Sequence, residues 1–211
     1  MKMGELAIGQ FRLALECLER CDRPLMSEVI ELGQQVNRLE VEVDSKCKLV
    51  LARRQPEAND LRVILTVLKI TGDIERIGDQ AELIVRRAEA LQCGQDLRLP
   101  RPDIRRCANL ALGMANDALH AFASSDTAIA SGVIRQDLNV NEEYRSLTRK
   151  LISHMLEDAE YVTAALDVLF VVKAIERIAD HAKNIAEYVI FMVKGDDVRH
   201  ASIEEMEKKA L

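Results

Sequence analysis

Apolar residues recur every three or four positions along most of the chain. One stretch carries Leu61, Ile64, Leu65 and Leu68, a spacing that places the side chains on one face of an α-helix. Sustained alternation with a period of two, which is typical of a half-buried strand, does not occur in the sequence. The pattern therefore predicts an all-α fold. The expected helices cover roughly residues 3–21, 25–53, 58–92, 103–123, 127–156 and 160–194, with a candidate helical turn near 203–209.

Prolines mark the places where the helical pattern pauses. Pro24 and Pro56 each fall between two expected helices, and Pro100 and Pro102 fall close together in the middle of the chain. Proline removes a backbone donor and clashes with the preceding turn, so it is disfavoured inside a helix. The expected organisation is a first unit at 1–93, a linker at 94–103, a second unit at 104–195 and a tail at 196–211.

The chain repeats itself internally. The pair Val36-Asn37 recurs as Val140-Asn141, an offset of 104 residues. The block Ile74–Asp79 recurs as Ile175–Asp180 with five identities in six positions, at an offset of 101 residues. Two repeated blocks in register indicate a duplicated supersecondary unit. The sequence thus predicts two tandem, pseudo-symmetric three-helix bundles, six helices in all.

Pairs of acidic residues four positions apart are the main candidates for chemistry. Glu75 and Asp79 share one face of the third expected helix, and Glu40 and Asp44 share one face of the second. If these helices are antiparallel neighbours, the four carboxylates can converge. Carboxylate oxygens that face each other suit a hard cation such as magnesium, manganese or calcium, and also iron.

The second half carries a related but altered set. Glu176 and Asp180 repeat the pair on the last expected helix, but Tyr144 and Thr148 stand where Glu40 and Asp44 have their equivalents. One turn earlier, Asp137 and Asn141 offer oxygen donors, and Asn184 extends the acidic column. A metal in the second half would need a ligand set shifted along the helices, so we expect the better metal site in the first half.

A second interpretation of these acids stays open. Acidic residues at this spacing are common on solvated helix faces, and Arg38, Arg76 and Arg177 are near enough in sequence to form salt bridges with them. The duplication favours the metal interpretation, because an arbitrary surface pair need not recur in both halves. His181 follows Asp180 and points about 100° away from it on a helix, so we expect a partly exposed polar residue rather than a ligand.

Charge and cysteine content limit the kinds of protein that this chain can be. The formal net charge of −6 lacks the cationic surplus of a general nucleic-acid binder. Five cysteines, an odd number without any Cys-x-x-Cys, fit buried thiols in a reducing compartment. Neither a signal peptide nor a membrane-spanning segment is expected.

The sequence contains no nucleophile arrangement and no phosphate-binding glycine-rich loop, so we expect no enzymatic activity. A carboxylate-bridged metalloenzyme is an alternative, although its typical Glu-x-x-His pairs are missing.

Long motifs in the right order resemble the PhoU family over nearly the whole chain. They lie at 53–56, 59–62, 68–69 and 74–79 in the first half, and at 174–180, 184–185 and 187–188 in the second, with a similar ending at 191–195 and 198–200.

The resemblance implies a fold of two three-helix bundles and a repressor of the phosphate-starvation response. It implies two partners, the ATPase subunit of a phosphate ABC transporter and a membrane sensor histidine kinase, and a homodimer in the cytoplasm, held at the inner membrane face through its partners. It also implies bound metal ions, of iron, zinc, manganese or magnesium. By motif, the implied ligands are Glu40, Asp44, Glu75, Asp79, Asp137, Asn141, Glu176 and Asp180. A metal-buffering interaction protein without phosphate specificity is the other alternative.

Overall fold

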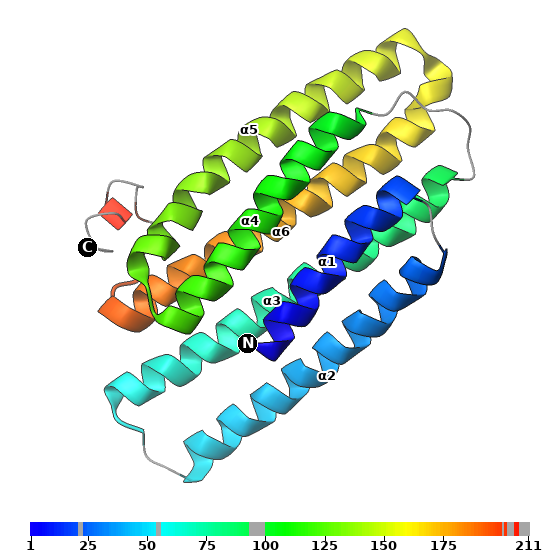
Figure 1. Cartoon of the computed structure of the whole chain (residues 1–211). Coiled ribbons are helices and arrows are strands. Elements are labelled where there is room, and N and C mark those ends of the chain that lie inside the picture. The colour runs from blue at the N-terminus through cyan, green and yellow to red at the C-terminus, as the bar shows by residue number, and fades with distance from the viewer. Residues whose placement is uncertain (21–22, 54–55, 93–99, 200, 202–204, 207–211) are drawn as a thin grey trace.

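Long helices account for almost all of the structure, a computed structural model that describes residues 1–20, 23–53, 56–92, 100–199, 201 and 205–206. In these residues the helices are α1 (Lys2–Arg20), α2 (Arg23–Arg53), α3 (Ala58–Gln92), α4 (Arg101–Ser124), α5 (Thr127–Glu157) and α6 (Val162–Lys194). A 3-10 turn, η1 (Ala159–Tyr161), leads into α6, and no strand occurs in the described part of the chain. The predicted all-α fold is confirmed, with α1–α3 and α4–α6 as its two halves (Figure 1).

The second half begins earlier than the prolines suggested. Helix α4 starts at Arg101 rather than at 103, with Pro100 just before it and Pro102 in its first turn. The first turn of a helix leaves its N–H groups without intrahelical acceptors, so a residue that lacks this group fits there. These prolines therefore start a helix. Residues 93–99 of the expected linker lie outside the described residues, as does most of the turn expected near 203–209.

The connection from α4 to α5 is tight and locally encoded. Ser125 ends α4 in the left-handed conformation, with φ of 54°. The side chain of Asp126 then caps α5 by accepting hydrogen bonds from the backbone N–H groups of Ala128 at 2.8 Å and Ile129 at 3.0 Å. Such a cap satisfies donors that the first turn of a helix cannot pair by itself.

Helices α3 and α6 join the two halves by packing side by side in antiparallel directions (Figure 1). The Lys69 Nζ atom lies 5.0 Å from the ring centre of Tyr188, and the Arg87 Cζ atom lies 4.4 Å from the ring centre of Phe170. At the repeat offset of 101 residues, Lys69 is equivalent in sequence to Phe170, and Arg87 is equivalent to Tyr188. The same cation–π contact is thus made twice, with cation and ring exchanged between the helices. The two halves are related by an approximate two-fold axis.

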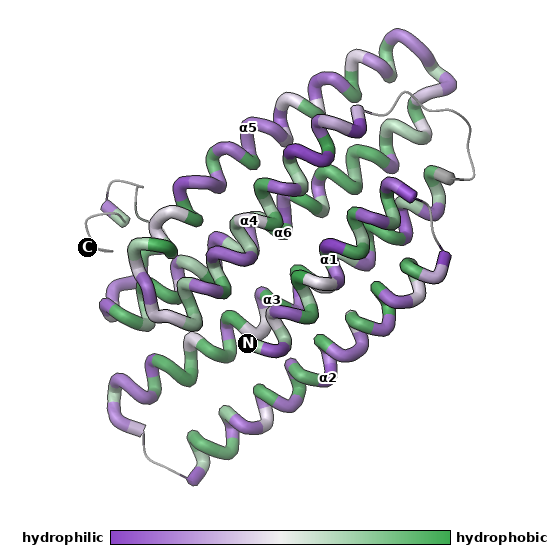
Figure 2. Tube along the Cα trace, viewed as in Figure 1, coloured by the Kyte–Doolittle hydropathy of each residue, from purple (hydrophilic) through white to green (hydrophobic). Residues whose placement is uncertain are grey.

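A hydrophobic core runs through both halves. Figure 2 shows apolar and polar positions alternating around each helix in the manner of amphipathic helices. Helix α6 is the most extensively buried, because it packs against α3, α4 and α5. Large side chains that are essentially inaccessible to solvent include Phe11, Ile77, Met114, Leu147, Ile178 and Ile185.

Truncation of repeat-related core residues tests the duplication. Ile77 and Ile178 occupy equivalent positions and are 2% and 0% exposed. We expect Ile77→Ala and Ile178→Ala each to lower the free energy of unfolding by about 2–5 kcal/mol, because each removes buried apolar surface and leaves a cavity. Urea denaturation measures the change, and Leu156→Ala, at a residue 84% exposed, should change it by less than about 0.5 kcal/mol. A small effect at Ile178 with a large one at Ile77 would contradict a shared core.

Candidate metal centres

The first-half carboxylates come together between α2 and α3. Glu40 on α2 and Glu75 on α3 are half-buried, and Asp79 lies one turn further along α3. Burial raises the pKa of the Glu75 carboxyl, and the negative charges of Asp79 and Glu40 raise it further, partly offset by Arg76. The convergence that the spacing suggested therefore holds for Glu40, Glu75 and Asp79.

Asp44, the fourth residue of the predicted first-half set, lies differently. Its carboxylate accepts an ion-paired hydrogen bond at 2.5 Å from the Nζ atom of Lys48, one turn further along the same helix. Both side chains are well exposed to solvent. As the side chains lie in the structure, Asp44 has the arrangement of a solvated salt bridge.

The second-half residues also converge, but lysines lie among them. Glu176 is buried and pairs with Lys173 at 2.6 Å, while the buried Asp137 pairs with Lys183 at 3.1 Å. Burial raises the pKa of the Asp180 carboxyl, with further contributions from Glu176 and Asp137, although both lysines act against them. Here the acids carry their own counter-ions.

Two neighbouring side chains complete this second-half arrangement. The Asn141 amide donates a hydrogen bond to Asp137 at 3.0 Å, and the Tyr144 ring lies 5.1 Å from the Lys173 Nζ atom. The side-chain N–H of Asn141 is therefore engaged in a hydrogen bond with Asp137. Tyr144, which replaces the acid found at Glu40, holds Lys173 beside Glu176 through a cation–π contact.

The difference between the halves is a difference of charge. At the repeat offset of 101 residues, Lys173 corresponds to Gly72 and Lys183 to Glu82. Neither lysine therefore has a basic equivalent in the first half. Within the described residues, no lysine or arginine forms an ion pair with Glu40, Glu75 or Asp79.

The oxygen donors of the first half fit a hard cation, because clustered carboxylates without a counter-ion repel one another. As the side chains stand in the described residues, no group of three or more His, Cys, Asp or Glu is arranged to hold a metal ion. The first half thus supplies the charge for a cation rather than a finished coordination sphere. In the second half, the lysine ammonium groups already supply the positive charge.

One polar cluster was missed by sequence reasoning. Asp73 of α3 is 8% exposed, and its Oδ1 atom lies 2.7 Å from His181 Nδ1 and accepts a hydrogen bond from Asn184 at 3.1 Å. Both partners lie on α6, so Asn184 contacts the other half of the molecule and does not extend the column of Glu176 and Asp180, as the sequence had suggested. No sequence signal pairs residues more than a hundred positions apart; only the α3–α6 packing does.

The cysteines described by the structure behave as buried apolar residues, as predicted. Cys17, Cys47 and Cys107 are buried, whereas Cys21 and Cys93 lie outside the described residues. Burial raises the pKa of the Cys107 thiol to about 12, so the thiolate that would bind a metal is disfavoured there.

A family model described as the PhoU domain matches this chain twice, at residues 1–88 and 104–189. The chain belongs to the PhoU family. It is 38% identical over 213 residues to the phosphate-specific transport system accessory protein PhoU homolog of a Burkholderia species, covering 100% of this chain and 91% of that protein. It is 36% identical over 210 residues to the phosphate-specific transport system accessory protein PhoU of Escherichia coli (strain K12), covering 99% of this chain and 86% of that protein.

Solved PhoU structures have the same fold. The crystal structure of PhoU from Pseudomonas aeruginosa has a TM-score of 0.89 at 38% identity and covers 92% of this chain and 93% of that one. A phosphate transport system regulatory protein PhoU from Streptococcus pneumoniae has a TM-score of 0.85 at 23% identity, over 93% and 92% of the two chains, and supports the fold alone. The PhoU resemblance seen in the sequence motifs is confirmed. No helix among the described residues is long and apolar enough to cross a membrane.

Glu187 gives this PhoU fold a pH dependence. Burial raises the pKa of the Glu187 carboxyl to about 7, although Lys183 and Arg199 lower it. In the unfolded chain this carboxyl group loses its proton near pH 4. The folded state therefore binds more protons than the unfolded state between about pH 4 and pH 7. Stability is therefore lost as the pH rises through this window.

We expect Glu187→Gln to raise the free energy of unfolding of metal-free protein by about 1–3 kcal/mol at pH 8, and by much less near pH 4–5. Urea denaturation after chelation, repeated across this pH range, measures the difference. The matched change Glu142→Gln, at an exposed position, should leave the profile unchanged. A stabilisation by Glu187→Gln that is the same at every pH would contradict the assignment.

Proposed function

We propose that this chain is a regulatory accessory protein of a phosphate-specific transport system and represses the phosphate-starvation response. The observation that carries the proposal is full-length similarity, at 36–38% identity, to proteins named as accessory proteins of that system. Regulation, rather than catalysis, is the role we assign. Its proposed partners are the transporter's ATPase subunit and a membrane sensor histidine kinase, which it meets as a cytoplasmic homodimer at the inner face of the membrane.

Exposed apolar residues offer docking surfaces for such partners. Leu61 and Leu65 near the start of α3 are 38% and 43% exposed. Their repeat equivalents near the start of α6, Val162 and Leu166, are 36% and 43% exposed. Apolar surface that recurs at both positions supports protein contacts, because exposed apolar groups gain free energy when a partner covers them.

Association with the two partners is the direct test. We expect the purified chain to be retained by the immobilised ATPase subunit and by the kinase's cytoplasmic portion. Leu65→Glu and Leu166→Glu should weaken at least one of these associations by about tenfold, since a buried unpaired charge is costly. The matched control is Leu138→Glu, at a residue of α5 that is 53% exposed and lies outside these two apolar surfaces. No retention by either partner, in high or low phosphate, would count decisively against the proposal.

A gene deletion separates the proposal from a metal buffer without phosphate specificity. The regulatory role requires phosphate-regulated transcription to rise in phosphate-rich medium when the chain is absent. Unchanged transcription would favour the metal buffer. Light scattering of the purified protein tests the proposed homodimer.

We also propose that the first half binds a hard cation through Glu40, Glu75 and Asp79. The support is electrostatic: these carboxylates face one another without an ion-paired lysine, whereas Lys173 and Lys183 neutralise the equivalent region of the second half. A bound divalent or trivalent ion would supply the missing positive charge and hold α2 against α3. Asp44, Asp137, Asn141, Glu176 and Asp180 remain predicted ligands of secondary importance.

Metal analysis of matched variants tests this asymmetry. We expect Glu75→Gln/Asp79→Asn to reduce the metal bound after purification and dialysis by at least about tenfold, because it removes two charged ligands. Glu176→Gln/Asp180→Asn, the repeat-equivalent change, should reduce it much less. Elemental mass spectrometry measures the metal, and circular dichroism checks folding. Equal metal in wild type and the first-half variant, or loss only in the second-half variant, would contradict the proposal.

A further inference from the structure

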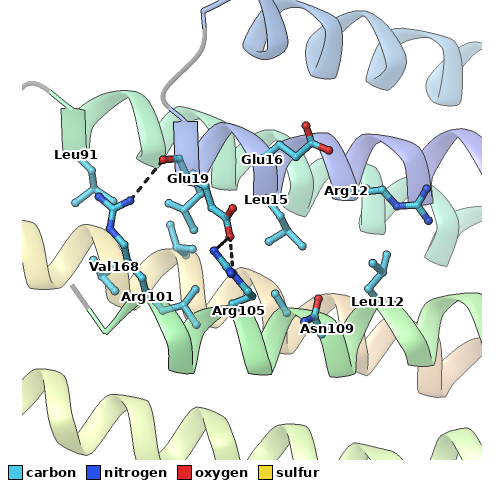
Figure 3. Close-up of a pocket in the computed structure, with 14 residues that line it drawn as sticks. Arg12, Leu15, Glu16, Glu19, Leu91, Arg101, Arg105, Asn109, Leu112 and Val168 are labelled. Atoms are coloured by element: carbon cyan, nitrogen blue, oxygen red, sulfur yellow. Dashed lines mark hydrogen bonds and ion pairs between the residues drawn. The ribbon is translucent and has the colours of Figure 1, made fainter.

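A cavity of about 390 Å³ lies where α1 of the first half meets α4 of the second (Figure 3). Its walls are aliphatic side chains from four helices, among them Leu15 of α1, Leu91 of α3, Leu112 of α4 and Val168 of α6. This volume falls within the range of small-molecule sites. The cavity is separate from both carboxylate clusters, none of whose residues line it.

The two ends of the α1–α4 seam differ in how tightly they pack. At the other end a Cβ on Gly4 would approach Leu119 Cδ1 to 2.5 Å, so Leu119 packs directly on a bare backbone and is 6% exposed. At the repeat offset of 104 residues, Gly4 is equivalent to Ala108 and Leu119 is equivalent to Leu15. Ala108 carries the Cβ that Gly4 lacks, and Leu15, unlike Leu119, is only partly buried. Both Ala108 and Leu15 line the cavity.

Arginines surround the mouth of the cavity. Arg105 donates a hydrogen bond to the Glu19 carboxylate at 2.7 Å, and Arg101 donates one to the Glu19 carbonyl oxygen at 3.5 Å (Figure 3). Arg12 is exposed and forms no ion pair in the described part of the chain. With Glu16 as the second acid, three arginines outnumber two carboxylates. The mouth is therefore positive on a chain whose formal charge is −6.

We propose that this cavity binds an amphipathic anion, a molecule with an aliphatic body and one carboxylate or phosphate head. The body would cover Leu15, Leu112 and the other aliphatic walls, which offer apolar contact. The head would meet the guanidinium groups at the mouth, which bind carboxylates and phosphates through charge-assisted hydrogen bonds. This ligand lies beyond the regulatory function proposed above and does not depend on it.

Calorimetric titration of the full chain with decanoate, below its micelle concentration, tests the proposal. Decanol and decyltrimethylammonium share the tail but not the negative head. We expect saturable binding of decanoate at one site, at least about fivefold weaker binding of decanol, and none of the cationic probe, because only the anion gains from the arginines.

Variants locate the site. Leu15→Trp places a bulky ring inside the cavity and should weaken decanoate binding by at least about tenfold, since the ring occupies space that the aliphatic tail needs. Asn109→Asp adds a negative charge at the mouth and should weaken binding about fivefold. Asn116→Asp, at an exposed residue of the same helix outside the cavity, should not change it. Arg12→Gln should weaken binding several-fold, whereas Arg145→Gln on the distant surface of α5 should not. Circular dichroism checks that each variant is folded.

Sedimentation with vesicles distinguishes the two sources of such a ligand. Binding to phosphatidylcholine vesicles only when they contain phosphatidic acid, lost in Leu15→Trp, would support a membrane lipid. Decanoate binding without vesicle binding would support a free amphiphile. Absence of decanoate binding overturns the proposal, as does binding unaffected by both Leu15→Trp and Asn109→Asp. Equal affinity for all three probes also overturns it, because the cleft would then be purely apolar and suited to a partner's side chains.

Discussion

The antiparallel packing of α3 on α6 is the interaction on which the rest of the structure depends. It joins the two halves along the longest helices and sets the approximate two-fold axis between them. Cation–π contacts lie near both ends of the junction, and the Asp73–His181 pair at 2.7 Å lies between them. Each end of the junction repeats the contact at the other end with the two helices exchanged, so α3 and α6 pack against each other in the same way from either half. The carboxylate clusters and the α1–α4 seam take their positions from this junction.

Duplication preserved the backbone more strictly than the charge. The repeated acids stand at equivalent places on α3 and α6, yet lysines pair with acids of the second set, Lys173 with Glu176 and Lys183 with Asp137. The first half has Gly72 and Glu82 at the positions of these lysines. A buried carboxylate needs a counter-charge, and a lysine and a metal ion satisfy that need in different ways. An ion pair within the chain supplies this counter-charge without a bound ion. The three carboxylates proposed to bind a cation in the other half have no such ion pair in the described residues.

Small residues decide how closely the halves approach. Along the α1–α4 seam, Gly4 lets Leu119 pack against backbone at one end, while Ala108 and Leu15, the repeat equivalents, line a cavity at the other. Helices pack at distances set by the side chains at the contact, so substitutions between the repeats change how the seam is filled. The departure from two-fold symmetry thus falls on two kinds of position, the charged cluster and the seam. These are the two places for which we propose a ligand.

The helical fold, the duplication and the family were determined by the sequence, because apolar periodicity and repeated motifs are local signals. The start of α4 was misplaced by two residues, since a proline in a first turn resembles a proline in a linker. Tertiary structure alone decided which candidate acids meet. It paired Asp137 of α5 with Lys183 of α6, and Asn184 with Asp73 across the halves. The pairs Asp44–Lys48 and Glu176–Lys173, in contrast, form within a single helix. Spacing along a helix fixes a shared face, but the partner across that face depends on how the helices pack.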